Sequence, residues 1–251
     1  MASEWVGFAN FEKFLTDPYF YRIFRNTILL GVYQIIFAFP TPIIMALLLN
    51  ELKSERFKRT IQTISYMPHF ISMVVVVGLI SNFLSYDGVL NKFLAFIRVK
   101  PATWLLIPGA FRSIYTVSSI WQELGWGSIV YLAALTGIDP QQYEAATIDG
   151  AGRLQRIRYI TLPGILPTVT IMFIFKVGAI MSASFEKVLL LYNPSVYETA
   201  DIIATYVYRR GLLQSDFSYG TAVGLFNSLV ALFFLAITNG ITRKLGETSL
   251  W

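Results

Sequence analysis

Residues 144–163 read EAATIDGAGRLQRIRYITLP, a polar segment set between two stretches that are apolar enough to cross a bilayer. Most of its residues favour helix, and three of them are arginines. A membrane span has no use for so many polar groups in lipid, so we expect the segment to lie in water at one membrane face. This placement indicates a segment that another protein binds.

Local signals divide this region into two short helices. Asp139-Pro140 is typical of a helix start, because Asp caps free amide groups and Pro fits the first turn. The first helix is expected to stop at Gly150, which can adopt the positive φ of a turn. A second helix is expected to begin at Arg153 and to end at Leu162-Pro163. The alanines after Glu144 would let a partner helix approach closely.

The composition is that of an integral membrane protein. Hydrophobic residues make up 55% of the 251 and charged residues 14%, and the mean hydropathy is +0.57. Soluble domains carry about 25% charged residues. The net charge of +5 therefore belongs to loops between spans and does not indicate nucleic acid. The predicted fold class is an all-α polytopic bundle in lipid.

Five segments are long and apolar enough to be transmembrane helices, since a bilayer core needs about 20 residues per helix. They cover residues 26–49, 65–85, 113–137, 164–191 and 219–241. Prolines and glycines interrupt several of them, as membrane helices tolerate. The run Gly125-Trp126-Gly127-Ser128 is expected to be a packing point, because small residues let helices approach closely.

Several function classes are excluded by what the sequence lacks. It has no cysteine and a single histidine, His69, which rules out disulfides, thiol catalysis and a zinc site built on cysteine or histidine. Clustered carboxylates are also missing, which argues against a membrane enzyme. No GxxxxGK[ST] segment occurs, so the chain cannot power transport itself. We expect no metal or cofactor on this chain.

The spacing of the polar segment matches a family pattern. Glu-Ala-Ala at 144–146 is followed after three residues by Gly150, and after nine more by Ile160, one residue and Leu162-Pro163. This resembles the EAA loop of permease subunits in binding-protein-dependent ABC importers, which docks into the cytoplasmic ATPase. The resemblance assigns ATPase coupling to Glu144, Ala145, Ala146, Asp149, Gly150, Ile160, Leu162 and Pro163. The alternative is an amphipathic loop lying on lipid headgroups.

Other stretches extend the resemblance over the chain from residue 5 onward. Residues 50–52, 66–72, 185–194 and 198–209 look like the LplB-like branch, which imports polysaccharides and oligosaccharides and is related to the maltose-type permeases. The implied fold is the MetI-like bundle of type I importers. The implied function is ATP-driven import of an oligosaccharide or polysaccharide fragment by alternating access.

The resemblance also implies the partners and the location. The partners are a cytoplasmic ATPase dimer carrying ATP and Mg²⁺, a second permease subunit in a heterodimer, an extracytoplasmic solute-binding protein and membrane lipid. The location is the prokaryotic cytoplasmic membrane, with the 139–163 loop inside. Residues 1–25 would form an extracytoplasmic amphipathic segment, residues 26–241 the transmembrane domain and residues 242–251 a cytoplasmic tail. Family members usually begin with one more helix, which we expect to be missing here.

Two charged residues lie within predicted spans, where ionisable groups are functional candidates. Glu123 and Lys176 are both expected near mid-membrane, within reach of each other or in one polar cavity, which would lower the cost of burying both. In the alternative, the glycine-rich third span is distorted and Glu123 reaches the outer water. His69 is expected to be an interfacial residue at a cytoplasmic helix end.

A second candidate region lies near the outer end of the fourth span. Phe185, Glu186, Tyr192 and Asn193 combine aromatic rings with hydrogen-bonding groups, which suits a carbohydrate path. In the alternative, Glu186 and Lys187 are interfacial residues whose charged ends reach the water, and Tyr192 belongs to an aromatic belt.

The competing function is a self-contained secondary transporter or channel for a small polar solute. Such a protein is expected to show coupling-ion carboxylates or an internal repeat. The five segments show no paired similarity, and only Glu123 and Glu186 are carboxylates within spans. Lys176, Lys187 and the Arg209-Arg210 pair are compatible with an acidic sugar, although external arginines are more often ordinary loop residues.

Overall fold

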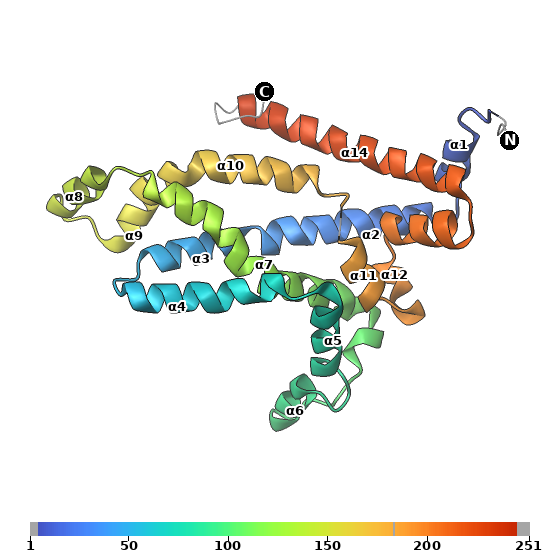
Figure 1. Ribbon diagram of the computed structural model, residues 1–251, viewed down its shortest axis with the longest axis horizontal. Coiled ribbons are helices and arrows are strands. Elements are labelled where there is room, and N and C mark those ends of the chain that lie inside the picture. The colour runs from blue at the N-terminus through green and yellow to red at the C-terminus, as the bar shows by residue number, and fades with distance from the viewer. Residues whose placement is uncertain (1–4, 183, 245–251) are drawn as a thin grey trace. The chain divides into compact units, whose positions relative to one another are not determined.

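The computed structural model describes residues 5–182 and 184–244, and in this part of the chain it contains helices and no strands (Figure 1). The α-helices are α1 (Ala9–Leu15), α2 (Phe20–Tyr33), α3 (Pro40–Asn50), α4 (Glu55–Tyr66), α5 (Met73–Phe83), α6 (Val89–Phe96), α7 (Pro108–Thr136), α8 (Pro140–Ile148), α9 (Arg153–Arg156), α10 (Leu162–Gly178), α11 (Phe185–Leu191), α12 (Tyr197–Ala200), α13 (Ile203–Val207) and α14 (Phe217–Lys244). Between them lie the π-helical turns η1 (Gln34–Ala38), η4 (Ile157–Thr161) and η6 (Tyr208–Leu213). The 3-10 turns are η2 (Met67–Phe70), η3 (Trp104–Leu106) and η5 (Pro194–Val196).

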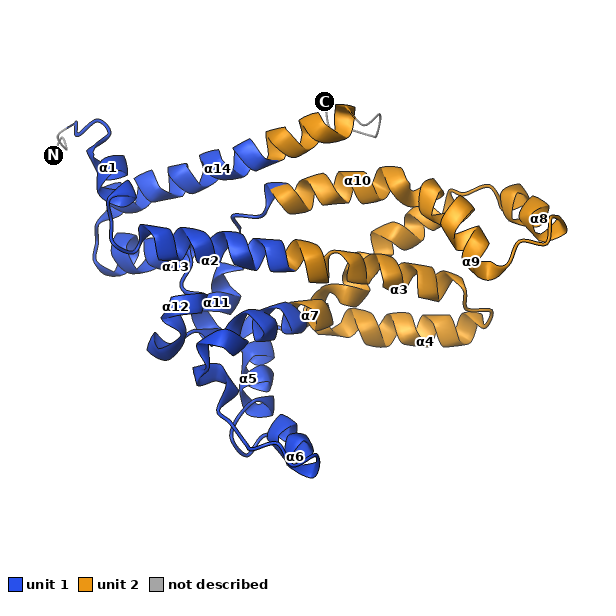
Figure 2. Ribbon diagram, turned by 180° about the vertical axis from the view of Figure 1, so that it is seen from behind, with its two compact units in different colours: residues 1–33, 72–118, 178–234 blue, residues 34–71, 119–177, 235–251 orange. Residues whose placement is uncertain are grey.

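The helices group into two compact units, coloured separately in Figure 2. Unit 1 takes residues 1–33, 72–118 and 178–234, and unit 2 takes residues 34–71, 119–177 and 235–251. The long helices α7 and α14 each contribute residues to both units. The chain therefore passes repeatedly from one unit to the other.

Within the described residues, three helical stretches are long and apolar enough to cross a membrane. They are Phe20–Asn50, which joins α2 to α3; Arg153–Gly178, which joins α9 to α10; and Phe217–Lys244, which is α14. The first begins before residue 26, so the predicted end of the N-terminal segment falls inside α2. The third extends into the predicted tail, of which residues 245–251 lie outside the described residues.

The span predicted at 65–85 is wrong as a continuous helix. The chain forms α4 and η2, then breaks at Ile71 and Ser72, whose ψ angles are 133° and 146°, before α5 begins. Pro68 contributes to the break, because it removes an amide donor from the helix that precedes it. The two parts pass the test of length and apolarity only together, as a fourth, bent candidate span.

The span predicted at 164–191 is also wrong as one helix, because α10 ends at Gly178 and α11 begins at Phe185. Glycine has a low helix propensity and favours an end at this point. The chain that follows packs directly on α2 within unit 1. A β-carbon added to Gly31 would lie 2.5 Å from the carbonyl oxygen of Ile180, so only glycine allows this approach.

The span predicted at 113–137 corresponds to α7, which has 29 residues. It is long enough to cross a bilayer but does not reach the apolarity of the other three stretches. Polar residues along it, among them Gln122 and Glu123, account for the difference. All five predicted segments thus correspond to helical stretches, two of which are interrupted.

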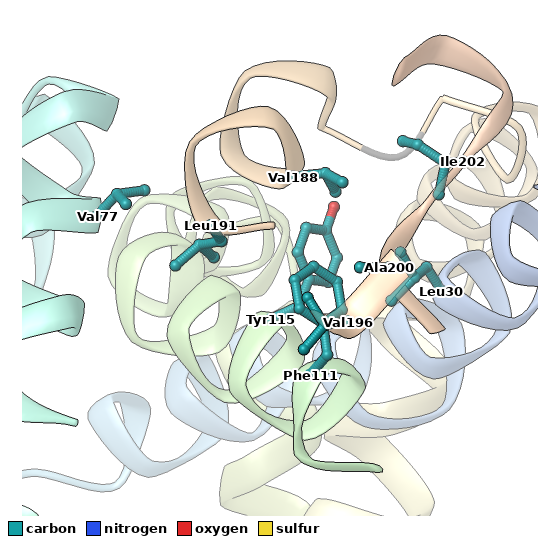
Figure 3. Packing of buried hydrophobic residues seen from close by; sticks show 9 residues of the cluster. All are labelled: Leu30, Val77, Phe111, Tyr115, Val188, Leu191, Val196, Ala200 and Ile202. Atoms are coloured by element: carbon teal, nitrogen blue, oxygen red, sulfur yellow. The ribbon is translucent and has the colours of Figure 1, made fainter. Parts of the chain in front are cut away.

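Unit 1 has its own buried apolar core, drawn in Figure 3. Its members come from α2, α5, α7, α11, α12 and the turns beside α12: Leu30, Val77, Phe111, Tyr115, Val188, Leu191, Val196, Ala200 and Ile202. Burying apolar surface from segments so far apart in sequence holds them together. This core therefore supports the short helices after residue 184, which carry the second group of candidate site residues.

Unit 2 has a smaller core formed by Ala46, Tyr131, Leu135 and Ile165. Close to it, α7 crosses α4 at Gly125, where an added β-carbon would lie 2.2 Å from the carbonyl oxygen of Ser65. The packing point predicted from the small residues at 125–128 is confirmed. The unit positions the polar segment 139–163, which projects from it (Figure 2).

Candidate functional site

The first helix of the polar segment is capped as the sequence predicts. Asp139 has an extended backbone and its Oδ1 accepts a hydrogen bond from Gln141 N at 2.9 Å, while Pro140 occupies the first helical position. At the other end Gly150 has a φ of +77°. Ala151 N then donates a hydrogen bond to Ala146 O at 2.8 Å, which is the Schellman arrangement of a helix end.

The second helix does not end at Leu162-Pro163, so that part of the prediction is wrong. The helix that begins at Arg153 runs on through η4 into α10 and ends only at Gly178. An interior proline removes one helical hydrogen bond and crowds the carbonyl four residues earlier. The π turn directly before Pro163 widens the helix, with Leu162 N bonded to Ile157 O, and so makes room for the proline ring.

Two side-chain hydrogen bonds hold α8 against the helix that follows it. The Tyr143 hydroxyl lies 3.0 Å from Thr161 Oγ1, and Arg156 Nη1 donates to Thr147 Oγ1 at 3.2 Å. Sequence reasoning missed both contacts, because each joins residues from opposite sides of the Gly150 turn. They tie α8 to the start of the helical stretch 153–178.

Much of the surface of α8 and α9 is exposed. Glu144 and Ala145 are exposed and Ala146 is half-buried. Two large apolar side chains, Ile148 and Leu154, are 87% and 79% exposed near the turn. Sequence reasoning missed these two, although an isoleucine and a leucine beside a polar turn are a usable signal. Apolar side chains next to small alanines suit insertion into a groove of another protein.

The remaining residues predicted to couple to the ATPase lie after α8, in η4 and at the start of α10. Asp149 is exposed and follows the last residue of α8, while Ile160 is half-buried inside the π turn. Leu162 and Pro163 are exposed at the start of α10. These positions shape the path of the chain between α8 and the span.

The nearest ionisable side chain to Glu123 is His69 and not Lys176. His69 Nδ1 lies 3.2 Å from Glu123 Oε2, and its ring stacks on Trp126 with centroids 4.5 Å apart and planes 3° apart. The Glu123 side chain is 55% exposed and that of His69 29%. That His69 is interfacial stays a prediction, but its contact with Glu123 was not foreseen, because 54 residues separate the two in sequence.

Lys176 is half-buried and close enough to Glu123 for an electrostatic interaction, while the prediction that the two share a polar cavity stays a prediction. The pair does not come within the 4.0 Å of an ion pair among the described residues. The arrangement is thus a histidine–glutamate contact with a lysine in the neighbourhood. A group of this kind can hydrogen-bond a polar solute.

The residues predicted around the end of the fourth span do not form a single cluster. Phe185 and Glu186 are exposed at the start of α11. Both functional groups of Asn193 are already used, since its Nδ2 donates to Leu105 O and its Oδ1 accepts from Ser195 N, each at 3.0 Å. Asn193 therefore anchors a turn, and its part in a sugar path stays a prediction.

Tyr192 joins a different group, which sequence analysis did not assemble. Its ring lies 4.9 Å from that of Tyr197, and its hydroxyl accepts a hydrogen bond from Arg209 at 3.4 Å. Burial raises the pKa of the Tyr192 phenol above its ordinary value, although the hydrogen bond from Arg209 lowers it in part. Tyr192 is thus half-buried, with its hydroxyl bonded to an arginine.

Lys187 is 1% exposed, so the interpretation that its amine reaches the interfacial water is wrong. Its Nζ lies 5.5 Å from the centre of the Tyr115 ring, a residue of the unit 1 core. The tyrosine ring provides a cation–π contact within the fold. Lys187 belongs to the interior of unit 1.

Comparison with known proteins places the chain among transport proteins. Residues 19–247 match the family described as "Binding-protein-dependent transport system inner membrane component". The chain is 42% identical over 252 residues to the "Polygalacturonan/rhamnogalacturonan transport system permease protein YteP" of Bacillus subtilis (strain 168), a match that covers 100% of this chain and 78% of that protein. It is 43% identical over 250 residues to "Protein LplB" of the same organism, covering 99% and 79%.

Solved structures give the same result for the fold. The crystal structure of a bacterial alginate ABC transporter, in complex with an alginate pentasaccharide-bound periplasmic protein, contains a chain that superposes with a TM-score of 0.94 and 43% identity, covering 98% of this chain and 85% of that one. An amino acid ABC transporter matches with a TM-score of 0.57 and 18% identity over 96% of this chain and 100% of that one, which shows the shared fold alone. The predicted family and helical fold are confirmed. The chain belongs to the binding-protein-dependent transport system inner membrane components, and it is the permease subunit of an ABC importer.

Proposed function

We propose that this permease carries an oligosaccharide derived from an acidic polysaccharide into the cell. The proposal is supported by the relatives, one of which is named for polygalacturonan and rhamnogalacturonan and another of which was solved with an alginate pentasaccharide on its periplasmic protein. A second permease subunit completes the path, and an extracytoplasmic solute-binding protein delivers the sugar.

The energy comes from a separate ATPase dimer that binds ATP and Mg²⁺ and grips α8 on the cytoplasmic side. The observation that carries this part is the exposed face of α8 and α9, with Glu144 and the alanines beside the projecting Ile148 and Leu154. Movement of the ATPase displaces α8, and the contacts across the Gly150 turn pass the displacement to the 153–178 helix. The spans then alternate between two arrangements.

Glu144→Lys tests the coupling role. The substitution reverses the charge on the proposed contact face, so the variant should lose ATPase during purification and should lose ATP-driven uptake. Gln142→Lys is the matched control, because it adds a lysine at another exposed position of the same helix. Both variants are purified with the partner subunits, and the ATPase recovered per permease is measured. Equal ATPase recovery from the two variants would contradict the assignment.

Uptake into proteoliposomes tests the substrate class. With the binding protein and ATPase present, radiolabelled trigalacturonate should accumulate on addition of ATP, and a neutral maltotriose should not. Retention of the ATPase combined with uptake of the neutral sugar alone would overturn the acidic substrate and leave the importer assignment standing.

A further inference from the structure

A cavity of about 300 Å³ lies within unit 1, beside the first turn of α2. Three arginines and three tyrosines contribute to its wall: Arg22, Arg209, Arg210, Tyr19, Tyr197 and Tyr206. They come from α2 and the residue before it, from α12 and α13, and from the π turn η6. Small-molecule pockets begin at about this volume, so the cavity can hold one part of a larger ligand.

A buried carboxylate fixes two of the arginines. Asp201 is 0% exposed and accepts two hydrogen bonds from the Arg209 guanidinium, at 2.8 and 2.6 Å. Arg22 Nη2 lies 3.5 Å from the same carboxylate. Bidentate pairing holds a guanidinium in a defined orientation. Asp201 therefore positions both arginines but supplies only one negative charge for two positive ones.

Arg210 has a neutral hydrogen-bond partner. It is half-buried and donates to the Gln214 amide oxygen at 3.1 Å, and the Tyr206 phenol lines the same cavity. The Tyr206 hydroxyl in turn donates to the carboxylate of Asp17. Among the described groups that line the cavity or bond to its wall, three guanidinium groups thus meet two carboxylates. One positive charge remains for a ligand.

Aromatic rings flank these charges. Arg209 lies 4.9 Å from the centre of the Tyr197 ring, and Arg22 lies 4.7 Å from that of Tyr19. Burial is the main cause that raises the pKa of the Tyr206 phenol, and its hydrogen bond to Asp17 raises it further, so the group stays neutral at pH 7. Rings beside hydrogen-bonding groups suit a sugar, which offers both C–H faces and polar edges.

We propose that this cavity binds one uronate unit of the transported oligosaccharide, with the sugar carboxylate paired to Arg210. The inference rests on the proposed function and states where the acidic group binds. A guanidinium pairs with a carboxylate through two parallel hydrogen bonds, which a neutral ester cannot reproduce. The chain reaches residues 197–214 after the 153–178 span, so with the 139–163 loop inside, these residues are on the side from which an imported sugar arrives.

Binding of trigalacturonate and of its fully methyl-esterified form tests the proposal. Titration calorimetry is performed on the complete permease–ATPase complex in nanodiscs, without the binding protein. The wild-type complex should bind the acid about tenfold more tightly than the ester, the difference expected for one charge-assisted pair. Arg210→Gln should abolish this preference by weakening only the acid. Arg210→Lys keeps the charge without the planar fork, and should retain part of the preference.

Lys100→Gln is the matched control, because it removes one positive charge from an exposed residue that does not line the cavity. It should bind both ligands like the wild type. Recovery of the ATPase and the melting temperature show that each variant is folded, and Arg209 is left unchanged because it holds the fold through Asp201.

Three results would overturn the inference. They are equal binding of acid and ester by the wild type, no binding of the acid by a complex that is assembled and active in uptake, and an unchanged preference in Arg210→Gln. A failure of the proposed function itself appears differently, as loss of the ATPase during purification or as ATP-driven uptake of neutral sugars only.

Discussion

Gly125→Ala places a single methyl group where α7 meets α4, and its effect can be worked out from the geometry. The new carbon would lie 2.2 Å from the carbonyl oxygen and 2.3 Å from the carbonyl carbon of Ser65. Ordinary contacts begin at 3.4 Å, so the two backbones would have to separate by more than an ångström. Both obstructing atoms are main-chain atoms, which cannot rotate away as a side chain can.

The expected loss in the free energy of unfolding is the cost of overpacking minus the gain in helix propensity. Overpacking of a well-packed site costs up to about 3 kcal/mol, and the upper end applies because a helix backbone must move. Alanine recovers about 1 kcal/mol of helix propensity relative to glycine. We therefore expect Gly125→Ala to lower the free energy of unfolding by about 2 kcal/mol.

Titration of the purified permease with sodium dodecyl sulfate in mixed micelles measures this difference. Gly224→Ala in α14 is the matched control, since nothing lies within 4 Å of the added carbon and only the propensity gain remains. The control should be as stable as the wild type or slightly more stable. Equal stability of the two variants would refute the reasoning, because it would mean that α7 and α4 do not touch at this point.

The remaining predictions concern buried polar groups and the coupling turn. Asn91, 2% exposed, accepts a hydrogen bond from Trp104 Nε1 at 2.8 Å and donates to backbone carbonyls in the loops after α5 and after α6. Asn91→Ala should therefore cost about 2–3 kcal/mol in the same titration, and a neutral result would contradict this. Asp201→Asn should cost about 3 kcal/mol, because Arg209 loses its buried counter-charge; wild-type stability would exclude that role. Gly150→Val should reduce ATPase recovery whereas Gly150→Asn should preserve it, because Asn tolerates a φ of +77° and Val does not; the same recovery from both would show that the turn conformation is not needed.

Local signals in the sequence predicted the parts of the fold that depend on neighbouring residues. The cap at Asp139 and the left-handed turn at Gly150 each follow from the chemistry of one or two residues, and the structure has both. The close approach at Gly125 also follows from a run of small residues. Hydropathy located all five apolar stretches but not the breaks inside them.

The failures come from features that depend on distant residues or on rare backbone geometry. A proline such as Pro163 normally ends a helix. Here the π turn before it lets the helix continue, and sequence patterns do not reveal such a turn. The contact of His69 with Glu123 and the assembly of Arg22 with Arg209 around Asp201 join residues far apart in the chain. Arg209 and Arg210 therefore look like ordinary loop arginines in the sequence, and only the fold shows that they share a cavity.

The π turn at Ile157–Thr161 also determines the direction, around the axis of the 153–178 helix, in which the residues before the turn point. A π turn holds one residue more than the α-helical turn it replaces, and each residue of an α-helix advances the chain by about 100° around the axis. Deleting one residue from this turn would let the stretch from 153 to 178 become regular α-helix. The exposed end of the polar segment, with Ile148 of α8 and Leu154 of α9, would then point in a different direction around the helix axis, although every residue of that end would be unchanged.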